Sequence, residues 1–182
     1  EYVRTIMEKG DQLLQLIASI LEATRIEDDN APMPRAPVDM VTLIGAAVAA
    51  LTPQAQKKQL QMSFLANTDI PRVLGDREKL RKVLFNLLAN AIKFTPNNGR
   101  IELRAEVSEI PSLATLSDRP DVDQPSGLRI TVRDTGVGID RAKLSRIFEP
   151  FFQADSSSTR EYGGAGLGLA LAKKLVEMHG GK

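Results

Sequence analysis

The sequence predicts an α+β protein in which helices pack on one face of a mixed β-sheet, preceded by one long helix. Segments with helical periodicity are interleaved with segments that alternate apolar and polar residues, without strict βαβ repetition. A proline-rich stretch over residues 30–37 separates the opening helix from these segments. With 42% apolar and 26% charged residues, the 182-residue chain has the composition of one soluble globular domain with a helical appendage.

Residues 1–29 carry a helical seam. Apolar or small residues recur there in steps of three and four, at Val3, Ile6, Gly10, Leu13, Ile17, Ile20 and Thr24. Further leucines widen this stripe, so we expect the helix to belong to a bundle; a solvent-edged linker helix is the alternative, favoured by the glycine in the seam. Three prolines then predict a stiff linker over 30–37, followed by one domain over 38–182.

Four helices are predicted in the domain. Asp39 suits an N-cap for a helix from Met40 to about Lys58, and Asp76 for one that runs through Phe94. Asp140 can cap a short helix to about Phe148, and a last helix spans Leu167 to Met178. The expected inner faces consist of Val41, Ile44, Val48 and Leu51 in the first helix and Leu80, Val83, Leu84, Leu87, Leu88 and Ala91 in the second.

Three strands are predicted from alternation of apolar and polar residues. The expected inward residues are Leu60, Met62, Phe64 and Ala66, then Ile101, Leu103, Ala105 and Val107, then Leu128, Ile130 and Val132. The segment 109–127 between the last two strands is too long for an ordinary hairpin loop, so we expect a surface insertion.

Composition excludes several functions. The formal charge is only +1, which argues against a dedicated nucleic-acid binder. Cysteine is absent, so disulfides, thiolate metal sites and cysteine nucleophiles are excluded. No apolar run approaches the roughly 20 residues that span a bilayer, and no signal peptide opens the sequence. We expect a cytoplasmic fragment without direct membrane contact, whatever anchors its parent protein.

One polar stripe is predicted on the second helix. Asn86, Asn90 and Lys93 lie at i, i+4 and i+7, within about 60° of one another around the helix axis. Two amides and an ammonium that face one way suit a polyphosphate and its Mg²⁺, because Mg²⁺ prefers oxygen ligands and retains several waters. A helix whose polar face simply meets water is the alternative.

A carboxylate and two glycines follow the third strand. Asp134, Gly136 and Gly138 form a D-x-G-x-G segment in which glycine lets the backbone turn sharply beside a flat ligand. An ionised carboxylate only accepts hydrogen bonds, which favours the amine of adenine over the carbonyl of guanine. An ordinary Asp-Gly turn is the alternative.

Glycines also open the last helix, in the segment Gly163-Gly164-Ala165-Gly166-Leu167-Gly168. Glycines at 164, 166 and 168 allow backbone N–H groups to converge on an anion at the helix N-terminus. The pattern lacks the Lys-Ser/Thr ending of a Walker A loop. A glycine-rich turn without a ligand is the alternative. Ahead of it, Phe148, Phe151 and Phe152 are interpreted as a packing cluster, with loop closure as a secondary role.

Taken in order, these four segments closely resemble the N, G1, F and G2 boxes of the ATP-binding catalytic domain of sensor histidine kinases. The resemblance covers about residues 37–181, and the opening helix looks like the second helix of the family's dimerisation and phosphotransfer bundle. It implies a Bergerat-type two-layer fold, shared with gyrase-type, mismatch-repair and heat-shock chaperone ATPases, in which ATP lies between helices and a mixed sheet.

The resemblance also implies a role for each site residue. Asp134 would bind the adenine amine and Asn90 the Mg²⁺, while Asn86 and Lys93 would support the phosphates. The remaining cofactor-binding positions would line the pocket or close over the phosphates, namely Phe94, Gly136, Gly138, Gly164, Gly166, Leu167 and Gly168. The ATPase relatives generally carry Glu at the position of Asn86; an amide is no general base, which favours transfer to a supplied acceptor over hydrolysis.

The implied activity is that of a protein-histidine kinase, incomplete in this chain. The acceptor histidine would lie on a bundle helix upstream of Glu1, whereas His179 is expected at a surface or helix-capping position. Partners implied are a second copy through the bundle and the receiver domain of a response regulator, with no nucleic acid. Two departures are Ala165, where the family often has Thr or Ser, and an end at Lys182, before the family's terminal strand pair.

Two other functions remain open at this stage. One is a non-catalytic nucleotide-dependent switch or scaffold, which the first bundle helix of the parent protein would distinguish from a kinase. The other is a water-using ATPase of the same fold, which Asn86 disfavours and which rapid hydrolysis without an acceptor would support.

Overall fold

The computed structural model describes residues 3, 7, 10, 33–67, 69–109, 126–153 and 166–182. The chain divides into two compact units, Arg35–Val137, and Glu1–Pro34 with Gly138–Lys182. Of the helix expected over 1–29, three positions are described, Val3, Met7 and Gly10, and all three are helical. The rest of that helix lies outside the described residues, as do positions 110–125 of the expected insertion.

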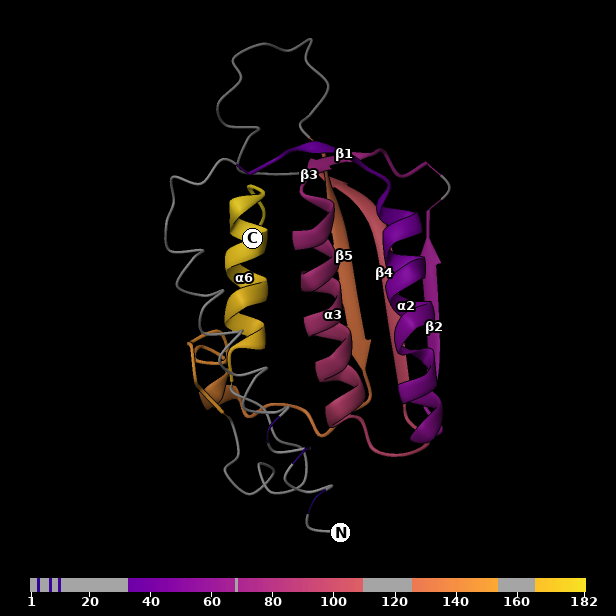
Figure 1. The fold of residues 1–182 in the computed structure, drawn as a ribbon, viewed down its shortest axis with the longest axis vertical. Coiled ribbons are helices and arrows are strands. Elements are labelled where there is room, and N and C mark those ends of the chain that lie inside the picture. Colours follow the sequence, from indigo (N-terminus) through magenta and orange to yellow (C-terminus); the bar gives the residue numbers. More distant parts are fainter. Residues whose placement is uncertain are drawn as a thin grey trace. The chain divides into compact units, whose positions relative to one another are not determined.

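The unit Arg35–Val137 has two layers, a mixed sheet and two helices on one of its faces (Figure 1). In the sheet, the central strand β4 (Arg100–Glu109) pairs in parallel with β2 (Gln61–Ala66) and antiparallel with β5 (Ser126–Asp134). The helices are α2 (Met40–Lys57) and α3 (Arg77–Phe94). The predicted fold class, helices on one face of a mixed sheet, is confirmed.

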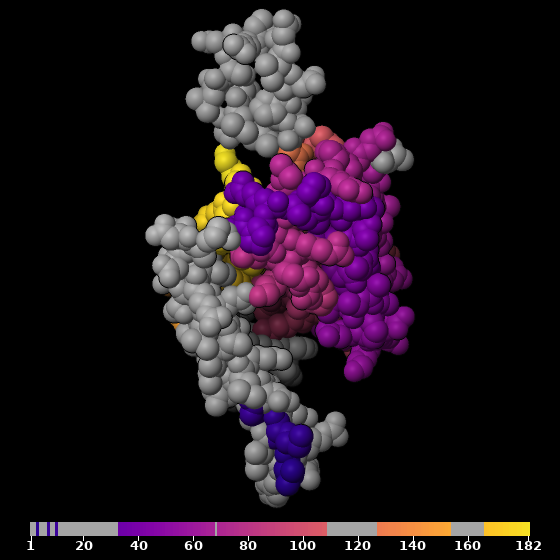
Figure 2. Space-filling view, turned by 45° about the horizontal axis from the view of Figure 1, so that its top comes forward, coloured from indigo at the N-terminus to yellow at the C-terminus, as the bar shows by residue number. Residues whose placement is uncertain are grey.

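Both helices begin at the predicted caps. The N–H of Thr42 donates to Asp39 Oδ1 at 3.0 Å, and the N–H of Glu78 donates to Asp76 Oδ1 at 2.9 Å. Each carboxylate satisfies an N–H group that has no partner inside the helix. The two helices lie against each other, and Figure 2 shows the purple surface of α2 adjoining the magenta surface of α3.

The core lies between these helices and the sheet. Its largest fully buried apolar side chains within this unit are Leu43, Ile44, Leu84, Leu88, Ile101 and Leu103. Three predicted inward positions are wrong. Ala66, the last residue of β2, is exposed. Val41 is 36% exposed because the buried stripe of α2 runs through Met40 and Leu43 instead. Val107 is 41% exposed because β2 ends opposite Ala105, so β4 continues there beside β5 alone.

A small second sheet was not predicted. Strand β1 (Ala36–Val38) pairs antiparallel with β3 (Val73–Gly75). The predicted linker therefore runs into a strand, since Pro37 lies opposite Leu74. Proline is compatible with so short a strand because it lies at a sheet edge.

The described part of the second unit contains one short and one longer helix. Asp140 caps as predicted, accepting from the N–H of Ala142 at 2.9 Å, but only a 3₁₀ turn follows, η1 (Arg141–Lys143). The predicted helix to Phe148 is wrong, because residues 143–149 close hydrogen bonds between positions three apart, which do not propagate an α-helix. The last helix, α6, spans Gly168–Met178. None of the described helices is both long and apolar enough to cross a membrane.

The turn from α3 to β4 requires glycine at position 99. A Cβ there would overlap the Thr95 methyl group and lie 3.0 Å from both Pro96 O and Thr135 Oγ1. We predict that Gly99→Ala lowers the free energy of unfolding by about 1–3 kcal/mol in urea denaturation. The matched control is Gly45→Ala inside α2, where no atom lies within 4 Å of the added Cβ, and which should stabilise by about 0.5–1 kcal/mol. Equal effects of the two substitutions would contradict this.

Candidate functional site

The polar stripe predicted on the second helix lies on α3. Asn86, Asn90 and Lys93 are all helical and partly buried. On the same helix, Leu84 and Leu88 are buried in the core, at 1% and 0% exposure, and fix the helix against the sheet. The stripe is therefore carried by a rigid element, and its two amides and ammonium keep their spacing.

The last turn of α3 ends on a buried threonine. Thr95 is fully buried, and both its hydroxyl and its N–H donate to Ala91 O, at 2.6 and 3.0 Å. Its methyl group is in contact with Gly99, as described above. These contacts fix the point at which the chain leaves the helix, immediately after Lys93 and Phe94.

The turn after β5 lies against that last turn. Asp134 is the final residue of β5, and its Oδ1 accepts from the N–H of Gly136 at 2.8 Å. The N–H of Val137 donates to Phe94 O at 3.3 Å. A Cβ on Gly136 would lie 2.8 Å from Phe94 O and 2.5 Å from Asp134 Oδ1, so glycine alone fits. Figure 1 shows the C-terminal ends of α3 and β5 at the same end of the unit.

This arrangement brings three predicted polar groups to one end of the unit. Asp134 is exposed, and within the described residues its Oδ2 has no hydrogen-bond partner. Asn90 precedes Phe94 by one helical turn, about 6 Å along the axis. The Asp134 carboxylate, which accepts hydrogen bonds, therefore lies close to the last turn of α3, the helix that carries Asn90 and Lys93.

The ammonium of Lys93 is partly desolvated. Burial lowers the pKa of Lys93 below its ordinary value, because the charged form loses hydration. Its Nζ lies 4.7 Å from the centre of the Phe94 ring, where the face of the ring attracts a cation. Phe94 is 38% exposed, so its ring is accessible to a flat ligand as well. An anion placed beside Lys93 would recover part of the lost hydration.

The glycine-rich positions belong to the second unit. Gly164 lies outside the described residues, while Gly138, Gly166, Leu167 and Gly168 are described there. Gly168 is the first residue of α6, and Leu167 precedes it without a side-chain cap. Gly138 has φ 73° in open space, a conformation that glycine adopts readily.

The segment before α6 is fastened to the aromatic cluster. The N–H of Phe151 donates to Gly166 O at 3.1 Å, and both residues have positive φ, 66° and 72°. Phe148 and Phe151 are 42% and 60% exposed, so packing does not explain them. Cations cover two rings instead, with Arg146 4.4 Å from the Phe152 ring centre and Lys173 5.7 Å from that of Phe148.

His179 lies at the end of α6, as predicted. It is the C-cap residue, and its Nδ1 lies 2.7 Å from Leu175 O, a distance at which a protonated Nδ1 donates to that carbonyl. This is a capping role. Among the described residues, no group of three or more His, Asp or Glu side chains could hold a metal ion. A cation bound at the C-terminal end of α3 would therefore be held by ligands other than such a cluster.

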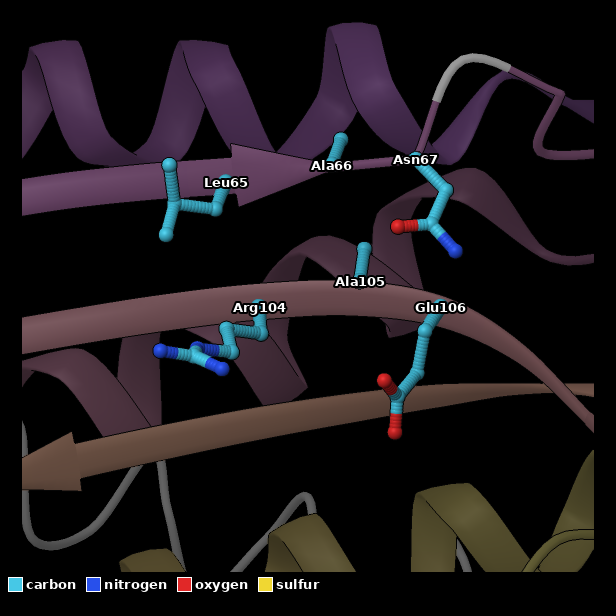
Figure 3. A pocket seen from close by; sticks show the side chains of 6 residues that line it. All are labelled: Leu65, Ala66, Asn67, Arg104, Ala105 and Glu106. Atoms are coloured by element: carbon cyan, nitrogen blue, oxygen red, sulfur yellow. The ribbon is translucent and has the colours of Figure 1, made fainter.

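A separate hollow of about 230 Å³ lies on strands β2 and β4 (Figure 3). Its lining comprises Leu65, Ala66, Asn67, Arg104, Ala105 and Glu106. None of these is a predicted site residue, so the hollow is distinct from the end of α3.

Three residues near the C-terminal end of α3 were not predicted from the sequence, namely Lys58, Thr95 and Thr135. Thr95 directly follows Phe94, and Thr135 directly follows Asp134. A polar side chain next to a predicted site residue was the feature of the sequence that could have identified both. Thr135 Oγ1 accepts from the N–H of Arg100 at 2.9 Å. Lys58 bonds carbonyls 34 and 35 residues away, which no local pattern reveals.

The comparison with protein families decides the affiliation. A family model described as histidine kinase-, DNA gyrase B- and HSP90-like ATPase matches residues 75–182, more than half of the chain. The chain belongs to this family. The predicted resemblance to the ATP-binding domain of histidine kinases is confirmed.

Relatives within the family are sensor kinases. The sensor protein GacS of Pseudomonas syringae pv. syringae is 36% identical over all of this chain, which spans 19% of that protein. The crystal structure of full-length ShkA in complex with AMPPNP is 32% identical, with a TM-score of 0.76 over 97% of this chain and 33% of ShkA. The histidine kinase ThkA in complex with the response regulator TrrA shares the fold, at 24% identity and TM-score 0.70, over 99% of this chain and 44% of that one.

Gly166 is required for two reasons, and they can be separated. Gly166 has a positive φ, and an added Cβ would lie 2.8 Å from Phe152 O. Gly180 also has a positive φ, but an added Cβ there would have no neighbour within 4 Å. We predict that Gly166→Ala speeds hydrogen exchange at the Phe151 amide by ten-fold or more, roughly the effect of 1–3 kcal/mol. Gly180→Ala, which shares only the backbone strain, should leave that amide unchanged. The same exchange rate in both variants would rule out the steric requirement.

Proposed function

We propose that this chain is the ATP-binding catalytic part of a sensor histidine kinase. It binds Mg-ATP, and the γ-phosphoryl group passes to a histidine on a helix bundle outside the chain, for relay to an aspartate of a response-regulator receiver domain. The observation that supports this most directly is the junction of α3 and β5, where Asp134 Oδ2 is open to a ligand close to the last turn of α3. Family membership and the AMPPNP complex of ShkA support the choice of nucleotide.

Asp134 is proposed to select adenine. Its Oδ1 is engaged by the Gly136 N–H at 2.8 Å, which leaves Oδ2 as a pure acceptor for the exocyclic amine of the base. Gly136 permits close approach of the backbone, and the exposed ring of Phe94 can line the pocket. Guanine would present a carbonyl to Oδ2, and two buried acceptors facing each other are unfavourable.

Asn90 is proposed to bind Mg²⁺. The donor set at this end of α3 is one amide oxygen, without a carboxylate cluster in the described residues, which fits a cation that keeps several waters and takes its other ligands from phosphate oxygens. Bound Mg²⁺ would neutralise phosphate charge. Asn86 and Lys93 support the phosphates, Lys93 as a partly desolvated point charge. Gly138 is proposed to shape the turn beside the base. The positions proposed to close over the phosphates are Gly164, Gly166, Leu167 and Gly168.

The side chain at position 86 favours transfer over hydrolysis. Asn86 is partly buried on the same helical face as Asn90. An amide cannot take a proton from water at neutral pH, so the site holds ATP without activating a water molecule. The acceptor is then another protein group, which in this proposal is the bundle histidine.

The remaining organisation follows the family pattern. Residues 1–29 are proposed to form the second bundle helix of a homodimer, 30–37 the linker and 38–182 the catalytic domain, in a cytoplasmic part of the parent protein. The described helices include none that could span a membrane. The similarity in fold to the complex of ThkA with its response regulator is in keeping with a receiver domain as partner.

The adenine contact can be tested by calorimetry. We predict that the chain binds Mg-ATP well above Mg-GTP, and that Asp134→Asn weakens Mg-ATP by about 5- to 150-fold, the range for an unsatisfied buried hydrogen-bond partner. With its amide oxygen held by Gly136, the Asn variant presents an NH₂ donor to the base, so discrimination against GTP should fall. Asp39→Asn is the control, because Asp39 caps α2 through Thr42. Undiminished ATP binding by Asp134→Asn would refute the proposed contact.

The phosphate role of Lys93 predicts a pH dependence. Lys93 is charged below its lowered pKa, so the free protein loses this charge at a lower pH than an ordinary lysine, whose pKa is about 10.4. Bound phosphate favours the charged form and raises the pKa again. Mg-ATP affinity should therefore fall as pH rises through the pKa of free Lys93, by at most ten-fold per pH unit.

The matched variants for this titration are Lys93→Met and Lys57→Met. Lys93→Met removes the titrating group and should flatten the pH profile, at a lower affinity throughout. Lys57 is exposed in the last turn of α2, so its replacement should leave the profile as in wild type. A wild-type profile in Lys93→Met would assign the titration to another group.

A further inference from the structure

Lys58 joins the end of α2 to the end of α3. It is the C-cap residue of α2 and is partly buried. Its Nζ donates to Ile92 O at 2.8 Å and to Lys93 O at 2.9 Å. Its own carbonyl accepts from the N–H of Asn98 at 3.1 Å. One residue therefore holds both the last turn of α3 and the turn that follows it.

The two carbonyls that Lys58 binds are at the negative end of a helix dipole. The last carbonyls of an α-helix have no partner within the helix and together carry about half a negative charge. An ammonium bonded to two of them satisfies both and offsets that charge. Without it, this end of α3 would repel an anionic ligand.

This negative end carries the groups assigned to the phosphates. Lys93 is itself one of the two residues whose carbonyl Lys58 binds, and Asn90 lies less than one turn earlier. Burial already removes part of the hydration of the Lys93 ammonium. The position of this ammonium and the charge around it therefore determine how strongly it attracts an anion. The contacts of Lys58 act on both.

We propose that Lys58 is a positioning residue for the phosphate half of the site, holding the last turn of α3 in place and neutralising its helix end. This inference rests on the proposed function of the α3 residues. Lys58 acts through Asn90 and Lys93 and is not assigned a contact with the nucleotide. The adenine half, at Asp134, does not touch Lys58, so the two halves should respond differently.

The experiment compares Mg-ATP and adenosine binding by calorimetry in wild type and in Lys58→Met, Lys58→Arg and Lys57→Met. Lys58→Met keeps a similar apolar length without donors or charge, and we expect Mg-ATP binding to weaken roughly ten-fold. Adenosine binding should change by less than about three-fold, because it lacks phosphates. Lys58→Arg should recover most of the Mg-ATP affinity, and Lys57→Met, on the neighbouring exposed position, should match wild type.

Hydrogen exchange at the amides of Lys93 and Phe94 gives a second measurement that needs no ligand. Faster exchange is expected in Lys58→Met and wild-type rates in Lys57→Met. If Lys58→Met does not fold by circular dichroism, Lys58→Gln, which keeps one donor group without the charge, takes its place in both measurements.

The outcomes separate this inference from the proposed function. Equal loss of Mg-ATP and adenosine in Lys58→Met would mean that Lys58 is merely structural, and unchanged Mg-ATP binding with unchanged exchange would also overturn the inference. Either result leaves the nucleotide site standing, provided that wild type binds Mg-ATP and Asp134→Asn binds it more weakly. Failure of wild type to bind Mg-ATP would remove the proposed function and this inference together.

Discussion

The contact between the last turn of α3 and the turn after β5 is the constraint on which the candidate site depends. Phe94 O accepts from the Val137 N–H, and Gly136 passes so close to the same carbonyl that a Cβ has no room. The start of β4 is tied to the same place, because Thr135 bonds Arg100 through both its N–H and its Oγ1. Three segments distant in sequence are thereby fixed together, mostly by main-chain contacts and by one bond to the Thr135 hydroxyl.

The C-terminal end of α3 also constrains where charged groups can lie. A helix C-terminus is a poor place to hold an anion, since its unpaired carbonyls carry partial negative charge. Here two lysines lie at that end: Lys58 bonds the last carbonyls, and Lys93 keeps a partly desolvated ammonium beside the Phe94 ring. The first satisfies carbonyls of the helix end, and the second is the residue that is proposed to support the phosphates. The proposed binding of a triphosphate at this end of α3 relies on this division of roles between two residues.

Sequence patterns predicted the elements well and their junctions poorly. Asp39 and Asp76 were predicted as caps because capping is local, and β4 was predicted because Ile101, Leu103 and Ala105 alternate with polar residues and are buried. The β1–β3 pair was missed, since three-residue strands show no periodicity. At the site, the spacing of Asn86, Asn90 and Lys93 was visible in the sequence. The Lys58 contact was not, because it spans more than thirty residues and depends on how α2 and α3 pack.

The two glycines of the D-x-G-x-G segment show why its spacing is meaningful although each part is common. Gly136 has no room for a side chain because Phe94 O and Asp134 Oδ1 occupy that space, whereas Gly138 stands in open space and is needed for its positive φ. The first requirement is imposed by α3 and the second by the path of the chain itself. Because Gly136 also donates to Asp134 Oδ1, the carboxylate that is proposed to bind adenine is oriented by a hydrogen bond within its own turn. The base-binding half of the proposed site is thus held by the turn after β5 and the phosphate-binding half by the last turn of α3, and Gly136 is the residue at which the two segments meet.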